Sequence, residues 1–508
     1  MARVTCYDGV GCIGGNKILL EDGETKLWLD FGMDFGRMGR FYEEYLKPKS
    51  STGIYELVQM RLLPPILDLY RDELICSNVA DPWDGMETQT VGRINGIVLS
   101  HAHLDHVGLL PYIRSDIPIY CSAMTFAITK AIQDTGTGAS SQYCYIKQPK
   151  ESKPGGLITF SGATGAQRRP FVFSRGCPSQ FSEFEVSASG RALKQTQGLS
   201  CGGLKVRSFP VDHSLYGACA WAVETSVGSV VYTGDLRCHG GQADLTWKFA
   251  EEVAKLKPRA LIIEGTRIDK DDTCTEGQVH ERALEEVGKA KGLVVADFGP
   301  RNIERLATFL EIGRQTGRRL VLLRKDAYLL DQMAMADDDG EVPSLQDEYI
   351  SIYEEYASSS YSWKTAIDEK YRGKLLKPRT VAGSQGDFIC CFSFWDVNEL
   401  AYIKPVAGSI WIYSSCEPFN EEMRIDVGRL REWLCEYGVR LLGDPRADEK
   451  NPFHASGHAC RSDLLKLIEI IRPQTVIPVH TEKPELYAEA LEGKCEVVLP
   501  ERGVPINL

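Results

Sequence analysis

The stretch Gly96-Ile97-Val98-Leu99-Ser100-His101-Ala102-His103-Leu104-Asp105-His106 decides how the rest of the chain is interpreted. Its first half is a short apolar, β-rich run that predicts a strand, and residues 107–113 are predicted to continue as a helix. Three histidines and an aspartate therefore lie on one tight loop. A lone histidine is usually a core or surface residue, but four ligand-type side chains within six positions favour metal binding. We expect His101 and His103 to point to one cation, and Asp105 and His106 to a neighbouring one.

Other ligand-type residues also follow predicted strands. His213 follows the strand 206–211, and His480 follows the strand 476–479. Asp235 comes after the strand 229–233, and its two carboxylate oxygens can bridge two metals. Asp30 ends the strand 26–30 and can hold a ligand histidine by its second ring nitrogen. Polar residues at strand ends are typical of a layered α/β hydrolase whose functional groups lie on loops at one edge of its sheets.

Length and composition set broad limits. A chain of 508 residues predicts two or three domains, and 43% hydrophobic with 25% charged residues is ordinary for a globular protein. The N-terminus lacks a secretory signal, and no apolar run reaches the roughly 18 residues of a membrane span. The 16 cysteines include no Cys-x-x-Cys pair, which favours reduced thiols. We therefore expect a cytoplasmic protein with no membrane contact.

The formal net charge of −12 excludes a protein that coats nucleic acid by bulk electrostatics. It does not exclude a nuclease, because bound cations and a local basic groove can hold phosphates within an acidic protein.

The middle of the chain has a different organisation. Strands and helices alternate from about residue 275 to 439, including the strands 292–298, 319–323, 388–392 and 409–413 and a helix over 301–312. Residues able to do chemistry resume at His454, so we predict that a second α/β unit is inserted into the first. The expected domains are 1–274, an inserted unit 275–439, and a completing segment 440–508. Two stretches, about 37–92 and 129–203, are expected to be surface elaborations.

These residues resemble the four successive motifs of the metallo-β-lactamase superfamily: Asp30, the run from His101 to His106, His213 and Asp235. The resemblance implies an αββα sandwich, here with an inserted α/β β-CASP domain. Two divalent metal ions are implied as cofactors, with zinc expected and manganese as the alternative. Carried over by position, one metal takes His101, His103 and His213, the other takes Asp105, His106 and His480, and Asp235 bridges them.

Three later motifs resemble the β-CASP branch, which processes nucleic acids. They are Glu264 in Leu261-Ile262-Ile263-Glu264-Gly265-Thr266, His458 in His454-Ala455-Ser456-Gly457-His458-Ala459, and His480 in Pro478-Val479-His480-Thr481-Glu482. Histidine at the third motif goes with RNA-directed members, whereas DNA-directed relatives typically carry valine there. The resemblance therefore implies an RNA substrate.

Within that branch the chain is most similar to the ribonuclease J family. Three segments carry this similarity: the loop 454–459, Gly383-Ser384-Gln385-Gly386-Asp387, and Ser414-Ser415 with Asn420-Glu421. The resemblance implies a 5′-to-3′ exoribonuclease, an endoribonuclease or both. Asp105, His458 and Glu264 are the implied catalytic residues, with His458, steered by Glu264, stabilising or protonating the leaving 3′-oxygen. The implied phosphate or RNA contacts are His454, Ser456, Gly457, Ser384 and Gln385. Arg301 is a further candidate because it lies in a loop that opens a predicted helix.

Several local alternatives stay open. The segment Ser456-Gly457-His458 can instead cap a helix over 462–471. The loop Asp297-Phe298-Gly299-Pro300-Arg301-Asn302 can bind a phosphate at a helix start, or Asp297 can simply cap that helix. The basic and aromatic run from Arg168 to Arg175 can bind a nucleic-acid strand, although a solvated loop is the favoured explanation.

The chain also departs from the ribonuclease J pattern. It ends 28 residues after His480, so the usual C-terminal dimerisation domain is not expected and any homodimer would use other surfaces. The neighbours of Glu264, Gly265-Thr266-Arg267, differ from the family pattern. The competing functions are a DNA nuclease of the same branch, a non-catalytic RNA-binding scaffold and a small-molecule hydrolase.

Overall fold

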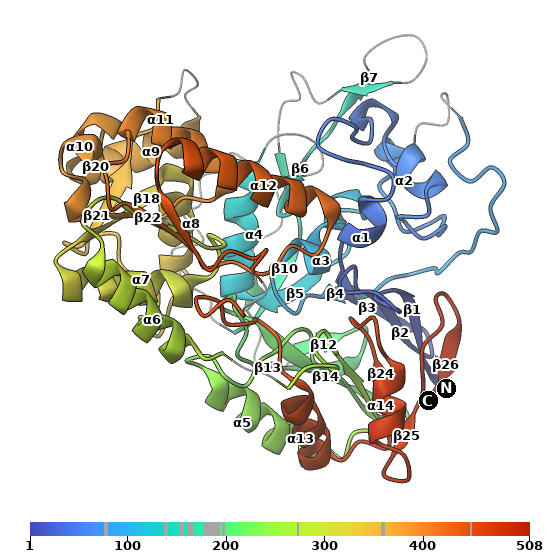
Figure 1. The fold of residues 1–508 in the computed structure, drawn as a ribbon. Coiled ribbons are helices and arrows are strands. Elements are labelled where there is room, and N and C mark those ends of the chain that lie inside the picture. The colour runs from blue at the N-terminus through green and yellow to red at the C-terminus, as the bar shows by residue number, and fades with distance from the viewer. Residues whose placement is uncertain are drawn as a thin grey trace.

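The computed structural model describes residues 1–75, 80–136, 141–151, 157–159, 166–175, 194–195, 199–271, 274–356, 361–447 and 450–508. Three large β-sheets organise this part of the chain, each containing strands from distant parts of the sequence. In Figure 1 the unit built on the third sheet (yellow to orange) lies beside a sandwich of the other two sheets.

The first sheet mixes an antiparallel half with a parallel half. Strands β1, β2 and β3 are antiparallel neighbours, and β3, β4, β5, β10 and β11 run parallel. Its order is β11-β10-β5-β4-β3-β2-β1-β26. The strands are β1 (Ala2–Asp8), β2 (Lys17–Asp22), β3 (Thr25–Phe31), β4 (Gly96–Val98), β5 (Ile119–Ser122), β10 (Phe171–Arg175), β11 (Lys194–Gln195) and β26 (Pro505–Asn507).

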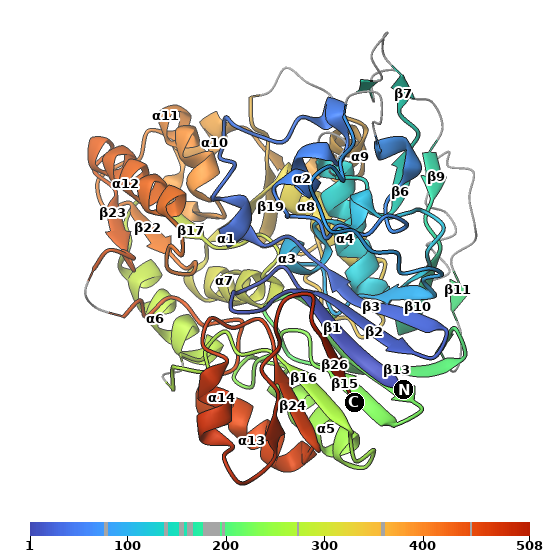
Figure 2. The same cartoon turned by 90° about the vertical axis from the view of Figure 1, so that its right-hand side faces the viewer.

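The second sheet faces the first and has the order β12-β13-β14-β15-β16-β24-β25. Figure 2 shows β1–β3 facing the strands of this sheet, with α5, α13 and α14 on its outer side. These elements are β12 (Leu199–Cys201), β13 (Leu204–Pro210), β14 (Cys219–Thr225), β15 (Gly228–Tyr232), β16 (Ala260–Ile263), β24 (Thr475–Pro478), β25 (Glu496–Val497), α5 (Ala243–Ala254), α13 (Arg461–Ile471) and α14 (Glu485–Ala490).

Alternating side chains on β3 explain why the two sheets pack. Leu27 and Leu29 point into the core between the sheets, together with Trp221 and Ile262 of the second sheet. Trp28, between them in sequence, points to the opposite face and packs in a separate core. Side chains alternate across a strand, so a strand that is apolar at successive positions buries both faces. The result is the expected αββα sandwich.

The third sheet is wholly parallel, in the order β20-β19-β18-β21-β17-β22-β23. Its strands are β17 (Val294–Asp297), β18 (Arg319–Leu323), β19 (Ile350–Tyr353), β20 (Leu375–Leu376), β21 (Phe388–Cys390), β22 (Ile410–Tyr413) and β23 (Arg440–Leu442). β23 pairs with β22, so this sheet continues past the predicted end of the inserted unit at residue 439.

Helices cover both faces of the third sheet, as a parallel sheet requires. One apolar core contains buried residues of α6 (Glu276–Lys289), α7 (Ile303–Thr316), α8 (Arg324–Ala334) and α9 (Ser362–Lys370), and the opposite core contains residues of α10 (Pro378–Gly383), α11 (Leu400–Ile403) and α12 (Glu421–Glu436). The first of these cores also includes Ile128 of α4 (Ala123–Thr135). This core therefore joins the third sheet to the sandwich.

The stretch 37–92 was expected to be a surface elaboration, and this expectation is wrong for much of it. Leu57 and Val58 of α2 (Tyr55–Gln59), together with Leu63, Ile66 and Leu69, are buried in the core on the outer face of the first sheet. This segment covers an apolar sheet face that would otherwise contact water.

The stretch 129–203 is also only partly peripheral. Its residues 171–175 form β10 beside β5, with Phe171 and Phe173 buried. Arg169 is fully buried, and its guanidinium donates to the carbonyls of Leu110 and Ile113, both at 2.7 Å. The run 168–175 is therefore largely a strand rather than a solvated loop, with its two phenylalanines buried and Arg175 exposed. Residues 187–190, whose Ser-Ala-Ser-Gly sequence predicts a loop in this stretch, lie outside the described residues.

The helix predicted over 107–113 is two short elements. Helix α3 (Leu104–Val107) ends at the cap residue Gly108, and a single 3-10 turn follows at Leu110–Tyr112. Pro111 lies in the first turn of the 3-10 segment, where its missing N–H costs no hydrogen bond. In the described part of the chain no helix is both long and apolar enough to cross a membrane.

A buried network of charges joins the inserted unit to the sandwich. Arg237, which follows β15, binds Asp212 at 3.0 Å and Glu276 of α6 at 3.3 Å. Arg305 of α7 binds both oxygens of Glu276, at 2.9 and 3.0 Å, and donates to the carbonyl of Phe453 at 2.8 Å. Both arginines are fully buried, so their charges depend on these partners.

Replacing Arg305 is expected to destabilise the protein strongly. Arg305→Ala leaves the Glu276 carboxylate without its main partner, which costs about 3–5 kcal/mol for a buried ion pair. We expect a lower midpoint of denaturant unfolding, monitored by tryptophan fluorescence. The exposed pair Arg314–Asp347 provides the control, because Arg314→Ala should cost less than about 1 kcal/mol. Equal midpoints for the two variants would contradict this account.

Candidate metal centre

Strand ends from both sheets meet at one edge of the sandwich. His101 follows β4 in the first sheet, whereas His213, Asp235 and His480 follow β13, β15 and β24 in the second. β15, β16 and β24 run parallel, so the residues after them emerge at the same edge. The sequence-predicted ligands are thereby brought together from positions almost 400 residues apart.

The first cluster contains three histidines and one aspartate. The Nδ1 atom of His103 lies 3.0 Å from Nε2 of His101 and 3.1 Å from Nε2 of His213. Oδ2 of Asp235 lies 3.6 Å from Nε2 of His101. Three ring nitrogens that converge at this spacing surround a volume the size of one cation.

The second cluster shares Asp235 with the first. Oδ2 of Asp235 lies 3.1 Å from Nε2 of His106 and 3.6 Å from Nε2 of His480. Oδ2 of Asp105 lies 3.2 Å from the same nitrogen of His480. The structure therefore brings all seven predicted ligands into two adjoining groups that meet at Asp235.

The second ring nitrogen of four of these histidines is held by a neighbouring group. His106 Nδ1 lies 2.7 Å from the buried carboxylate of Asp30, as the sequence suggested. The other three contacts are Ser100 Oγ to His101 Nδ1 at 3.0 Å, the Gly457 carbonyl to His213 Nδ1 at 2.6 Å and Thr266 Oγ1 to His480 Nδ1 at 2.9 Å. Such contacts fix each ring and leave Nε2 directed into the cluster.

The backbone is strained where it shapes this edge. Asp30 and His480 have φ values of 58° and 52°, a left-handed conformation that non-glycine residues rarely adopt. Gly32 must be glycine because a Cβ there would lie 1.6 Å from the Asp105 carbonyl oxygen. The metal loop is thus held against β3 by close backbone contact.

Electrostatics place three of the histidines and the bridging aspartate in their ligand forms. Burial keeps the pKa values of His101 and His213 well below normal, and burial with the charge of Arg301 lowers the pKa of His103 to about 4. Burial opposes ionisation of Asp235, but His106 and His480 hold its pKa well below the usual range. Neutral imidazoles and an ionised carboxylate are the forms that bind metal.

The residues fit a divalent cation in a further respect. Oδ1 of Asp235 is buried and has no hydrogen-bond partner in the described part of the chain. A buried carboxylate oxygen without a partner is costly, and a metal ion would satisfy it. The donor set of nitrogen and carboxylate oxygen suits a divalent metal such as zinc.

His458 and Glu264 form a pair beside the second cluster. Nδ1 of His458 lies 3.0 and 3.1 Å from the two oxygens of Glu264, which is itself held by the backbone N–H groups of Leu236 and Thr266. Burial disfavours the charged imidazole, but Glu264 overrides it and raises the pKa of His458 to about 9. The side chain keeps 22% of its surface exposed, so it can reach a bound molecule.

The loop 454–458 lies against this centre and does not cap a helix. Helix α13 begins at Arg461, and its cap residue Cys460 makes no capping hydrogen bond through its side chain. Ser456 Oγ instead accepts from the N–H of His458 at 3.1 Å. Gly457 is tightly packed, because a Cβ there would lie 2.8 Å from Ser214 Oγ. His454 is partly buried, and burial lowers its pKa to about 4.

Ser384 and Gln385 are not near this centre, which corrects the sequence prediction. They precede β21, whereas Asp297 and Ser414 end or follow the parallel strands β17 and β22 at the opposite edge of the sheet. Gln385 is buried, with Nε2 donating to the carbonyl of Lys404 at 2.9 Å and Oε1 accepting from the N–H of Val406 at 2.9 Å. Its amide is therefore occupied by the backbone.

The start of α7 shows that Asp297 is not the cap of this helix, which was one of the two predictions for the loop 297–302. The helix is capped by Asn302, whose side chain accepts from the N–H of Arg305 at 3.1 Å. Asp297 is buried and accepts from the Trp411 indole N–H at 3.0 Å, so it caps no helix. Burial raises its pKa to about 7.

The sequence did not reveal the residues that orient the metal ligands. Thr266 was noted only because it differs from the ribonuclease J pattern, yet its hydroxyl orients His480. Ser100, directly before the metal loop, donates to Asp30 at 2.6 Å and contacts His101. Their positions next to predicted functional residues were the only available signal.

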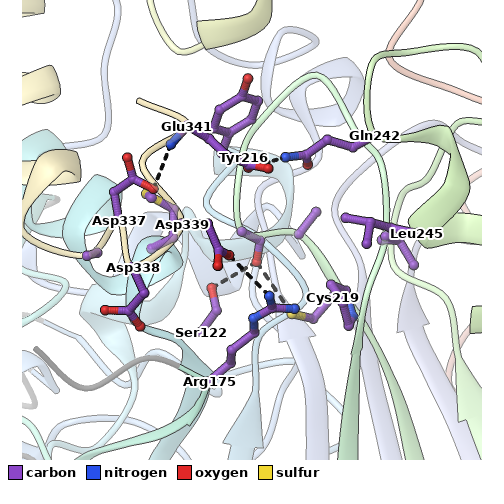
Figure 3. A pocket seen from close by; sticks show the side chains of 16 residues that line it. Ser122, Arg175, Tyr216, Cys219, Gln242, Leu245, Asp337, Asp338, Asp339 and Glu341 are labelled. Carbon is purple, nitrogen blue, oxygen red and sulfur yellow. Dashed lines mark hydrogen bonds and ion pairs between the residues drawn. The ribbon is translucent and has the colours of Figure 1, made fainter. Parts of the chain in front are cut away.

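An acidic cavity elsewhere contrasts with this centre. It has a volume of about 240 Å³ and lies between the 210–219 loop and the 336–341 segment (Figure 3). Asp337, Asp338 and Glu341 line it, and Arg175 pairs with Asp339 at 3.3 Å. Such a lining does not suit an anionic substrate.

The three sheets form a metallo-β-lactamase-type αββα sandwich with an inserted parallel α/β unit of the β-CASP kind. A crystal structure of a protein of unknown function from Enterococcus faecalis V583 has the same fold, with a TM-score of 0.68 and 23% identity over 100% of both chains. The expected fold class is confirmed.

Comparison with known proteins narrows this class. Residues 446–500 match the family described as Zn-dependent metallo-hydrolase RNA specificity domain. The chain is 24% identical to ribonuclease J 2 of Streptococcus pyogenes over 81% of this chain and 63% of the relative. It is 23% identical to ribonuclease J of Sinorhizobium meliloti, over 79% and 60% respectively. The predicted similarity to ribonuclease J is confirmed, and the chain spans less than two thirds of the length of these relatives.

Thr266 provides a test of the metal centre that does not need activity. Thr266→Val removes the hydroxyl that holds His480 while keeping the side-chain shape, and we expect zinc affinity to fall by about 10- to 100-fold. Competition with a chelating dye measures this affinity. Thr380→Val, on the exposed surface of α10, is the control. Unchanged affinity in Thr266→Val would show that the hydroxyl does not support a ligand.

Proposed function

We propose that this protein is a two-metal ribonuclease that hydrolyses phosphodiester bonds of RNA. The observation that carries the proposal is the pair of ligand clusters meeting at Asp235, with His458 and Glu264 beside them. The match of residues 446–500 to an RNA specificity domain, and the similarity to proteins named ribonuclease J, support RNA as the substrate.

The proposed ligand sets follow the two clusters. One ion is held by His101, His103 and His213, the other by Asp105, His106 and His480, with Asp235 between them. Zinc is the proposed metal, since the donors are nitrogen and carboxylate oxygen and the matched family is described as zinc-dependent. Two such ions activate water for attack and offset the charge that develops on the phosphate oxygens.

His458 is the proposed general acid. Glu264 accepts a hydrogen bond from Nδ1–H of His458, which leaves Nε2–H to deliver a proton to the departing 3′-oxygen. The high pKa of His458 keeps this proton available. Asp105 contributes as a carboxylate ligand that also fixes His480.

The proposed phosphate-binding loop carries His454, Ser456 and Gly457. It lies between the metal centre and the inserted unit, because His213 bonds the Gly457 carbonyl and Arg305 bonds the Phe453 carbonyl. A loop held from both sides has a defined geometry for a nucleic-acid backbone. Exonucleolytic and endonucleolytic cleavage both remain part of the proposal, in line with the ribonuclease J resemblance.

The primary test compares wild-type protein with His103→Ala. RNA carrying a 5′-monophosphate or a 5′-hydroxyl is labelled at its 5′ end and incubated with zinc or manganese, alongside matched DNA. We expect metal-dependent cleavage of RNA that falls by at least about a thousandfold in the variant, because loss of a ligand removes several kcal/mol of transition-state stabilisation. Mononucleotide products indicate exonuclease action, and internal fragments indicate endonuclease action.

Other outcomes would reject the proposal in distinct ways. Cleavage of DNA in preference to RNA would make the protein a DNA nuclease. Binding of RNA without cleavage under all metal conditions would favour a scaffold. Neither binding nor cleavage of nucleic acid would favour a small-molecule hydrolase.

His458→Ala tests the general acid separately from the metal ions. We expect kcat to fall by about 100- to 10,000-fold while bound metal, measured by elemental analysis, stays at the wild-type level. A parallel loss of metal would instead make His458 a ligand.

A further inference from the structure

One cation beside the metal centre comes from the inserted unit and has no assigned partner. Arg301 lies in the loop between β17 and α7. Its charge acts on His103, Asp105 and Tyr143, so the guanidinium lies close to the metal loop. Among the residues that the structure describes, its side chain has no hydrogen-bond or ion-pair partner.

The loop that carries Arg301 also shares an apolar core with the metal loop. Ala102, between His101 and His103, is fully buried in this core, which includes Phe298 and Ile303. Phe298 and Ile303 flank Arg301 in the sequence on both sides. A second link runs through Arg305, which bonds the Phe453 carbonyl, and the segment that follows bonds the metal ligand His213 through the Gly457 carbonyl.

The neighbouring arginines show that a free guanidinium here is unusual. Arg305, four residues later, is fully buried and bonds Glu276, the Ser414 carbonyl and the Phe453 carbonyl. Arg237 is saturated by carboxylates in the same way. Arg305 and Arg237 therefore stabilise the fold through buried ion pairs. Arg301, by contrast, is partly exposed, and its N–H groups are available to a ligand.

The loop that carries Arg301 is held rigidly. Asn302 caps α7, and the N–H of Asn302 donates to the carbonyl of Gly299 at 2.8 Å. Arg305 then fixes the first turn of the helix to Ser414 and Phe453. A donor on such a loop needs little reorganisation when it binds an anion.

The balance of charge indicates what Arg301 binds. Asp30, Asp105, Asp235 and Glu264 contribute four negative charges, which two divalent cations would neutralise, and the protonated His458 beside Glu264 adds one positive charge. A phosphodiester adds a further negative charge, and a guanidinium matches two phosphate oxygens with its planar fork. We propose that Arg301 binds a non-bridging oxygen of the scissile phosphate, so that the inserted unit completes the active site; this inference rests on the proposed function.

Kinetics on two substrates test this proposal. The variants are Arg301→Ala, Arg301→Lys and the control Arg314→Ala on the exposed face of α7. The substrates are an RNA oligonucleotide and bis(p-nitrophenyl) phosphate, a diester without flanking nucleotides. Arg301→Ala should lower kcat about 100-fold on both, as loss of one transition-state donor does, and Arg301→Lys should recover part of it. The control should match wild type.

Two results would overturn the proposal while leaving the proposed function intact. Wild-type kinetics in Arg301→Ala would show that the guanidinium touches no substrate. A change confined to KM for RNA, with bis(p-nitrophenyl) phosphate unaffected, would place Arg301 on a distant phosphate. Equal melting temperatures of the variants and wild type exclude a folding defect.

Binding of labelled RNA to the zinc-loaded protein, followed by fluorescence anisotropy, separates the two hypotheses. We expect about tenfold weaker binding by Arg301→Ala than by Arg314→Ala. If wild type cleaves neither substrate but this difference is found, the proposed function fails and the phosphate contact stands. If wild type cleaves neither and the two variants bind equally, both fail.

Discussion

The buried carboxylate of Asp30 is the interaction on which the metal centre depends. It accepts hydrogen bonds from the N–H and hydroxyl of Ser100, from the His106 ring and from the Tyr232 hydroxyl, at 2.6 to 2.7 Å. Ser100 directly precedes the metal loop, His106 belongs to it, and Tyr232 ends β15 of the second sheet. One fully buried anion thus ties both sheets together beneath the site. Its cost of burial is offset only when all these donors are present.

The inserted unit is built into this centre rather than attached to its surface. Glu276 binds Arg237 of the sandwich, and Arg305 binds the loop before His458. Ala102 of the metal loop shares a core with α7. These contacts fix where the second unit lies relative to the ligand clusters. A substrate held by the inserted unit would therefore meet the metal centre at a defined distance, which is what positional catalysis requires.

The distribution of charge is compatible with the proposed action of this acidic chain on an anion. The net charge is −12, and an acidic cavity is lined by the 210–219 loop and the 336–341 segment. The carboxylates at the metal centre would be neutralised by the divalent cations that they bind. His458 and Arg301 are the positively charged side chains next to them. Local composition rather than net charge decides the sign of the field at a site.

The sequence by itself determined the metal loop, the strand ends that carry His213, Asp235 and His480, and the presence of an inserted α/β unit. These features are local, because ligand types within six positions and apolar runs of strand length need no tertiary information. The sequence could not show that Thr266 orients His480, that residues 54–69 fill a sheet face, or that Arg301 approaches Asp105. It also suggested Ser384 and Gln385 as phosphate ligands, and the structure places them at the opposite sheet edge. A short motif does not specify at which end of a parallel strand it will lie. Only the order and direction of strands in the folded sheets bring residues distant in sequence within reach of one another.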